Sequence, residues 1–130
     1  MTDKGIAIVG KQNPGSGKGG FEHRLHQRRL AEVFLAQGYK AAIVEECKNG
    51  KNVDLGLSKD GQAIAVEIII SPQNAIENIE KDIAAGWKSV WLLCNTQAIL
   101  DGVKREWASS NSKYPSVEVE FYLLSDQRFF

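Results

Sequence analysis

The sequence predicts an α/β domain in which a mixed central sheet carries helices on both faces. In the first half of the chain, a helical stretch is followed by short strand-like runs around a tight-turn signal, as in an antiparallel meander. In the second half, helical and strand-like stretches alternate, as in crossover connections between strands. The 130 residues, 43% of them hydrophobic, are enough to bury one sizeable core.

The expected order is helix, three strands, helix, strand, helix, strand. Strong helix formers followed by Gly38 predict the first helix over 21–37, and its apolar stripe is Phe21, Leu25, Val33 and Phe34. The alternating and apolar runs "AAIVEE", "VDLGLS" and "QAIAVEIII" predict strands over 41–46, 53–58 and 62–70, with a polar turn at 47–52.

The second half of the chain supplies the remaining elements. Pro72 suits the first turn of a helix that runs to Ala85, with Gly86 as its stop. The apolar run 89–95 predicts a covered strand, and Thr96 can cap a helix that continues to Ala108. The alternation in "VEVEFYLL" predicts a last strand over 117–124.

Residues 1–20 are expected to be a flexible, glycine-rich linker or tether, which leaves 21–130 as the folded domain. A phosphate-binding loop is the alternative for "GKQNPGSGKGG". That loop requires a glycine, four residues and then Gly-Lys-Ser/Thr. One register places Ser16 at the lysine position, and the other places Gln12 at the first glycine, so both fail at groups that the chemistry requires.

Composition narrows the function classes. Lys+Arg and Asp+Glu number 16 each, so net charge predicts no general affinity for polyanions, and DNA binding would depend on local patches. Cys47 and Cys94 are expected to be reduced core residues. No apolar run approaches the roughly 18 residues needed to span a bilayer. We therefore expect a cytoplasmic domain with no membrane partner.

Two acids are expected to meet across the central hairpin. Asp60-Gly61 is a strong signal for a two-residue type I′ turn, and in that register each facing pair of residues has numbers that add to 121. Asp54 then faces Glu67 on the more open side of the hairpin, near the small residues Gly56 and Ala65. The other side is expected to form core through Leu55, Leu57, Ile64, Val66 and Ile68.

Like charges directly opposed on a sheet are destabilising, so this pair needs compensation. A divalent cation is one compensation, because Mg²⁺ is typically held by one or two carboxylates together with water and substrate phosphate. The alternatives are two solvated acids, or an acid paired with a lysine.

These residues resemble the PD-(D/E)xK superfamily of restriction-endonuclease-like nucleases. The resemblance implies a core of a helix, a three-stranded meander, a helix and a further strand, with an acid on the second strand and acid-x-Lys on the third. Asp54 and Glu67 match the two acids, and Glu22 in "GKGGFEHR" matches a third acid on the first helix. Together with "ENIEK", these motifs look like the nuclease-like domain of some conjugative-transfer and helicase-type ATPases.

The resemblance implies an Mg²⁺- or Mn²⁺-dependent DNA endonuclease of a mobile element, but one residue departs from the pattern. Ile69 occupies the position of the signature lysine, and Lys81 on the following helix is the candidate replacement. The alternative is a degenerate nuclease fold that binds DNA or a protein partner. A larger ATPase or a fused domain is a further expected partner, and an oligomer is possible.

The stretch "HRLHQRR" predicts a DNA-binding surface on the first helix. Glu22, His26 and Arg29 share a helical face, and Arg24, Arg28 and Arg29 make the stretch locally basic. Gln73, just after the third strand, is a candidate for orienting substrate. A solvated helix face is the alternative for the basic residues. The three tryptophans are expected in the core or at a packing edge: Trp87, Trp91 and Trp107. The C-terminal "RFF" is expected to dock against this domain or against another subunit.

Overall fold

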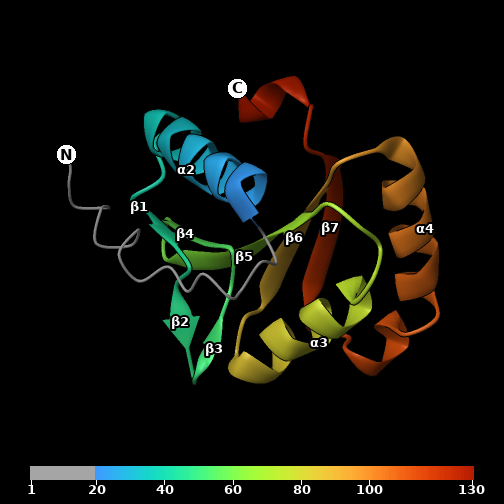
Figure 1. Ribbon diagram of the computed structural model, residues 1–130. Coiled ribbons are helices and arrows are strands. Elements are labelled where there is room, and N and C mark those ends of the chain that lie inside the picture. Colours follow the sequence, from blue (N-terminus) through green and yellow to red (C-terminus); the bar gives the residue numbers. More distant parts are fainter. Residues whose placement is uncertain (1–19) are drawn as a thin grey trace.

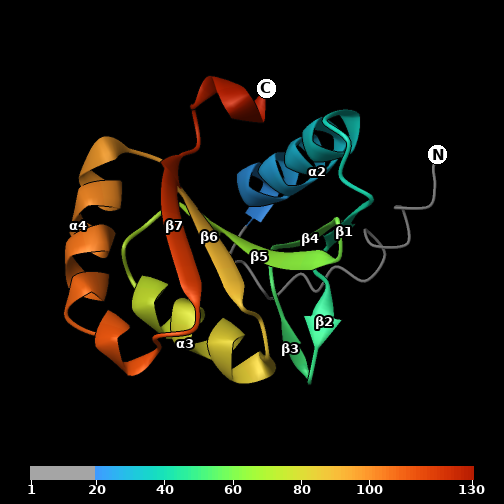
Figure 2. The same cartoon turned by 180° about the vertical axis from the view of Figure 1, so that it is seen from behind.

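The computed structural model describes residues 20–130 and has a five-stranded mixed sheet between two helical layers (Figure 1). The strand order is β1-β4-β5-β6-β7, in which the first two neighbouring pairs are antiparallel and the last two are parallel. Helix α2 covers one face, and α3 and α4 cover the other, as the reverse view also shows (Figure 2). The expected α/β class, with helices on both faces of a mixed sheet, is confirmed.

The elements follow the expected order, with one added hairpin and two short 3-10 helices. The main elements are α2 (Gly20–Ala36), β1 (Ala41–Val44), β4 (Leu55–Lys59), β5 (Gln62–Ile69), α3 (Ala75–Ala85), β6 (Ser89–Cys94), α4 (Gln97–Ala108) and β7 (Glu118–Leu123). The additional elements are β2 (Cys47–Lys48), β3 (Lys51–Asn52), η2 (Asn111–Lys113) and η3 (Gln127–Phe129). The segment predicted as a polar turn at 47–52 is therefore a small two-stranded hairpin.

The β4–β5 hairpin has the register that the sequence predicts. Asp60 and Gly61 both have positive φ, 53° and 79°, as a type I′ turn requires. The pairing runs from Lys59 opposite Gln62 to Leu55 opposite Val66. Each of these pairs adds to 121, so the turn chemistry alone determined which residues of the two strands face each other.

Both faces of β5 are buried. The residues expected to form core, Leu55, Leu57, Ile64, Val66 and Ile68, pack with Leu30 and Phe34 beneath α2. The alternate residues Ala65 and Ile69 belong to a second core beneath α3 and α4. The side of the hairpin that was expected to be open is therefore covered by helices, and this changes the environment of Glu67.

Several sequence-based details differ from the structure. Helix α3 begins at Ala75 rather than at Pro72, because Asn74 has a left-handed backbone (φ 66°) and separates the turn from the helix. On α2 the buried apolar residues are Leu30 and Phe34, whereas Phe21 is 70% exposed and Leu25 50% exposed. The predicted apolar stripe is thus wrong in its first half.

The cysteine and tryptophan expectations were mostly confirmed. Cys94 is buried and free, but Cys47 is exposed on β2, so it is not a core residue. Trp87 and Trp107 are buried, and Trp91 is half-buried at a packing edge. The predicted linker lies in residues 1–19, outside the described residues, and Gly20 already belongs to α2.

The C-terminal segment docks against this domain. Phe129 is fully buried beneath α2, while Phe130 is 69% exposed. Arg29 on α2 donates a hydrogen bond to the Phe129 carbonyl oxygen at 2.6 Å and lies over the Phe130 ring. Over residues 20–130, no helix is both long and apolar enough to cross a bilayer.

Candidate functional site

Asp54 is held at the point where the hairpin meets the first helix. It immediately precedes β4, and its Oδ2 accepts a hydrogen bond from the backbone N–H of Ile68 at 2.7 Å. The same oxygen lies 3.1 Å from Nε2 of His23 on α2, and Gln27 donates to the Asp54 backbone carbonyl at 2.9 Å. The Asp54 side chain is 22% exposed, so this carboxylate is fixed in position but still reaches solvent.

Glu67 is only 3% exposed, because α3 covers the face of β5 on which it lies. Its Oε2 lies 3.6 Å from Nζ of Lys81 and makes no hydrogen bond. The interpretation of the two acids as a pair on an open side of the hairpin is therefore wrong for Glu67. A buried carboxylate oxygen without a hydrogen bond is costly, so its presence in the fold requires an explanation.

A third acid, Asp82, is buried beside this pair. It is fully buried on α3, its Oδ1 lies 3.5 Å from Nζ of Lys81, and neither carboxylate oxygen makes a hydrogen bond. The sequence reasoning missed it. The available signal was helical spacing, because Asp82 follows Ala75 and Ile79 on the buried face of α3, where an acid is out of place.

The pKa values of the two buried carboxyls are both raised. Burial is the main cause that raises the pKa of Glu67 well above its ordinary 4.5, and the neighbouring Asp82 carboxyl and the charge of Asp54 raise it further. Burial likewise raises the pKa of Asp82, although Glu67 and Lys81 partly oppose that effect. Lys81 provides the positive charge that limits the rise in pKa of both acids.

His23 is electrostatically coupled to Asp54. Burial, the largest influence, lowers the pKa of His23, but the hydrogen bond and the charge of Asp54 together outweigh it. The pKa of His23 is therefore raised above its ordinary 6.5. A protonated His23 would partly neutralise the charge of Asp54 from the α2 side.

The structure brings some of the predicted site residues together. Lys81 lies next to Glu67, and its Nζ also donates to the Asn52 backbone carbonyl at 2.7 Å. Glu22 is on the exposed side of α2, where its Oε2 lies 3.8 Å from His26 and its side chain is 70% exposed. Among the described side chains, the α2 residue that contacts the Asp54 carboxylate is His23 rather than Glu22.

The predicted DNA-binding residues differ in their surroundings. Arg24 and Arg28 are exposed on α2, whereas Arg29 is partly buried and bonded to the C-terminal segment. The pKa of His26 is lowered, mainly by burial and then by the charge of Arg29. Gln73 is exposed in the turn before α3, and only its backbone N–H is bonded there, to Ser71.

The carboxylates provide a partial ligand set for a divalent cation. Within residues 20–130, no group of three or more His, Cys, Asp or Glu side chains is arranged to hold a metal ion. Mg²⁺ needs fewer protein ligands than that, since water and substrate phosphate commonly complete its octahedron. The unbonded Oε2 of Glu67 and the partly exposed Asp54 are oxygen donors of the required kind.

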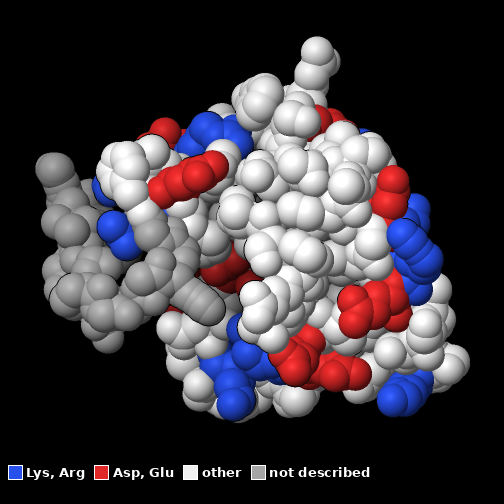
Figure 3. Space-filling model, turned by 45° about the vertical axis from the view of Figure 1, so that its right-hand side comes forward, with Lys and Arg blue, Asp and Glu red and all other residues white. Residues whose placement is uncertain are grey.

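Acidic and basic side chains both border a hollow on the surface. Figure 3 shows acidic atoms on the floor of a hollow and patches of lysine and arginine on either side of it. Acidic side chains also lie next to these basic patches, so the rim of the hollow carries charges of both signs.

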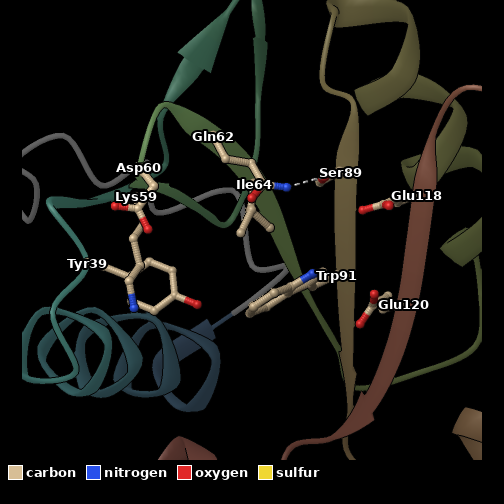
Figure 4. Close-up of a pocket in the computed structure, with 9 residues that line it drawn as sticks. All are labelled: Tyr39, Lys59, Asp60, Gln62, Ile64, Ser89, Trp91, Glu118 and Glu120. Carbon is tan, nitrogen blue, oxygen red and sulfur yellow. Dashed lines mark hydrogen bonds between the residues drawn. The ribbon is translucent and has the colours of Figure 1, made fainter.

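The pocket in Figure 4 is separate from the acids. It has a volume of about 200 Å³ and lies at the turn end of the β4–β5 hairpin, where Tyr39, Ile64 and Trp91 contribute its apolar wall. Ile64 and Glu67 point to opposite faces of β5, so the pocket lies across the sheet from Glu67. Glu118 and Glu120 on β7 line its far side.

Comparisons of this chain with protein-family models, with curated proteins and with solved structures found no match.

Proposed function

We propose that this chain is a restriction-endonuclease-like domain that hydrolyses phosphodiester bonds in DNA with the help of Mg²⁺ or Mn²⁺. The observation that carries the proposal is the position of Lys81. Its Nζ lies 3.6 Å from Glu67 even though Ile69 occupies the position of the signature lysine. The superfamily signature requires two acids and a lysine, and the candidates for them are Asp54 immediately before β4, Glu67 on β5, and Lys81 beside Glu67.

The element order supports the same proposal. The described chain runs α2, β1, β4, β5, α3 and β6, which is a helix, a three-stranded antiparallel meander, a helix and a further strand. This is the order that the resemblance implies. Asp54 lies at the start of the second meander strand and Glu67 near the end of the third, so both acids lie at the same end of the hairpin.

Each side chain has a definite role in the proposed reaction. Asp54 and Glu67 would hold the cation, which would supply a Lewis acid for the phosphate and for a water molecule. The bond from the Ile68 N–H orients Asp54, and His23 limits the repulsion between Asp54 and Glu67. Lys81 stabilises the negative charge that develops on the phosphate.

The proposed substrate is DNA, because the helix that contacts Asp54 also carries exposed arginines. Arg24 and Arg28 are exposed on α2, the helix that contributes His23 to the site. Contacts from these arginines to phosphates would position a strand over the acids without reading its sequence. Arg29 makes a weaker candidate, since its guanidinium is already bonded to the C-terminal segment.

The test is cleavage of a panel of single-stranded, duplex and branched DNA in the presence of Mg²⁺ or Mn²⁺. Cleavage is expected for the wild type, to fall at least about 100-fold in Asp54→Asn, and to fall similarly in Lys81→Met, which keeps the aliphatic stem. Glu106→Gln and Lys104→Ala on the exposed side of α4 are matched controls that should cleave at the wild-type rate.

Two results would count against the nuclease proposal. Cleavage that survives unchanged in Asp54→Asn would remove these acids from the mechanism. Absence of cleavage with every DNA and both metals, while DNA still binds, would select the degenerate binding module. The burial of Glu67 favours that second candidate, because a carboxyl that prefers its proton binds a cation only after losing it.

A further inference from the structure

We propose that the small hairpin at residues 47–52, called here the basic hairpin, is a phosphate-contacting wall of the DNA site, with Lys51 as its contact residue. It comprises β2, β3 and their turn, and it projects from the sheet beside α3 (Figure 1). The inference rests on the proposed function, since it names a surface that would hold the same DNA.

The basic hairpin is held firmly against α3. At its base, Lys81 donates to the Asn52 carbonyl oxygen at 2.7 Å. At its tip, Asn49 donates from Nδ2 to the Ala85 carbonyl oxygen at 2.6 Å. Between them, Nζ of Lys48 lies 4.5 Å from the centroid of the buried Trp87 ring. Separate contacts at the base, the middle and the tip therefore fix this short segment.

The contacts that hold the basic hairpin do not make it part of the hydrophobic core. Cys47, Asn49, Lys51 and Asn52 are all exposed, and the hairpin belongs to neither of the two hydrophobic cores. A two-stranded hairpin is marginal in water by itself, so its contacts with α3 are what hold it. A surface feature that is anchored but contributes no core is better explained by what it presents to solvent.

What the basic hairpin presents is positive charge. It contains Lys48 and Lys51 and no acid, and within residues 20–130 Lys51 makes no ion pair. The acid that precedes it, Glu46, lies over Gly56, where a Cβ would come within 1.8 Å of the Glu46 Oε1. Lys48 is engaged with Trp87, which leaves Lys51 as the lysine available to a ligand.

The position of Lys51 in the chain keeps it close to Asp54. Lys51 precedes Asp54 by three positions, which corresponds to at most about 11 Å of chain. One strand of a duplex carries a phosphate every 3.4 Å or so of helix axis. Lys51 can therefore contact a phosphate a few nucleotides from the one at the acids, while Arg24 and Arg28 contact the strand from the α2 side.

The test is DNA binding measured without cleavage. Fluorescence anisotropy of a short labelled duplex in EDTA, from about 50 to 200 mM NaCl, gives an affinity and a salt slope. Lys51→Ala is expected to weaken binding several-fold and to reduce the slope by about 0.9, the loss of one phosphate contact. Lys51→Glu should weaken binding further, and Lys104→Ala on α4 should change neither quantity.

The outcomes separate this inference from the nuclease proposal. Wild-type affinity and slope in Lys51→Ala would overturn the role of the basic hairpin and leave the nuclease proposal intact. Equal losses in Lys51→Ala and Lys104→Ala would show only general charge attraction and would also overturn it. If the wild type binds no duplex at the lowest salt concentration, both the proposal that DNA is the substrate and the proposed role of the basic hairpin are overturned.

Discussion

At the level of individual residues, the main feature is a pair of buried carboxyl groups, Glu67 and Asp82, next to Lys81. Glu67 and Asp82 are 3% and 0% exposed, and three of their carboxyl oxygens are buried without a hydrogen-bond partner. Core packing alone would favour apolar side chains at both positions. Their presence is the kind of local inconsistency that proteins retain at functional sites.

The raised pKa of Glu67 predicts a specific pH dependence of stability. Because burial and the neighbouring Asp82 raise this pKa in the folded state, the folded chain binds the proton more tightly than the unfolded chain. The stabilisation from protonated Glu67 is complete below the ordinary pKa of 4.5 and is lost as the pH rises through the higher folded value.

The substitution Glu67→Gln should therefore raise the free energy of unfolding at pH 8 and flatten its decrease between pH 5 and 8. Urea unfolding followed by far-UV circular dichroism at several pH values measures both. Glu106→Gln, which replaces an exposed acid on α4, should leave the pH profile as in the wild type. If the profile of the Glu67→Gln variant is as steep as the wild-type profile, Glu67 does not titrate in this range.

At the level of helices and strands, the sequence predicts an element boundary best where a side chain forms a hydrogen bond with the backbone at that boundary. Thr96 is the clearest case. Its hydroxyl accepts a hydrogen bond from the Ile99 N–H at 3.2 Å, and α4 begins at Gln97 as expected. Pro72 failed as a start signal for α3, because the left-handed Asn74 intervenes between the turn and the helix.

Removal of the Thr96 cap should destabilise the domain by about 1 kcal/mol, because the Ile99 N–H loses its partner. Thr96→Ala tests this by urea unfolding, and Thr96→Ser, which keeps the hydroxyl, should recover most of the loss. Equal stability of the alanine and serine variants would show that the cap contributes little to α4.

Across the molecule as a whole, the C-terminal segment packs against α2, the first helix of the described chain. Phe129 is fully buried, with its ring centroid 5.8 Å from that of Phe34 on α2 and 5.6 Å from that of Tyr122 on β7. The sequence left open whether the final aromatic residues pack on this domain or on another subunit. For Phe129 the structure places the side chain in the core of the same chain.

Phe129→Ala should therefore cost about 3–5 kcal/mol, as expected for loss of a buried phenylalanine. Phe130→Ala is the neighbouring control. Phe130 is 69% exposed and contacts Arg29 through its ring, so its loss should cost less than about 1 kcal/mol. Thermal unfolding monitored by tryptophan fluorescence compares the two. Similar melting temperatures for both variants would contradict the role assigned to Phe129.

The α/β class, the order of the main elements and the register of the central hairpin could all be predicted from the amino-acid sequence. These features follow from local chemistry, because turn residues, caps and the spacing of apolar side chains act over a few positions. Asp54 and Glu67 were named as candidate site residues from the strand register and the motif, and Lys81 from the family resemblance.

The surroundings of those groups, by contrast, depend on the packing of distant elements. Nothing local to Glu67 shows that α3 buries it, that Asp82 lies beside it, or that His23 rather than Glu22 contacts Asp54. Burial and charge coupling are set by which helices and strands pack together across the sheet. Those contacts join residues 31 positions apart in the case of His23 and Asp54, which is beyond the range of any local pattern.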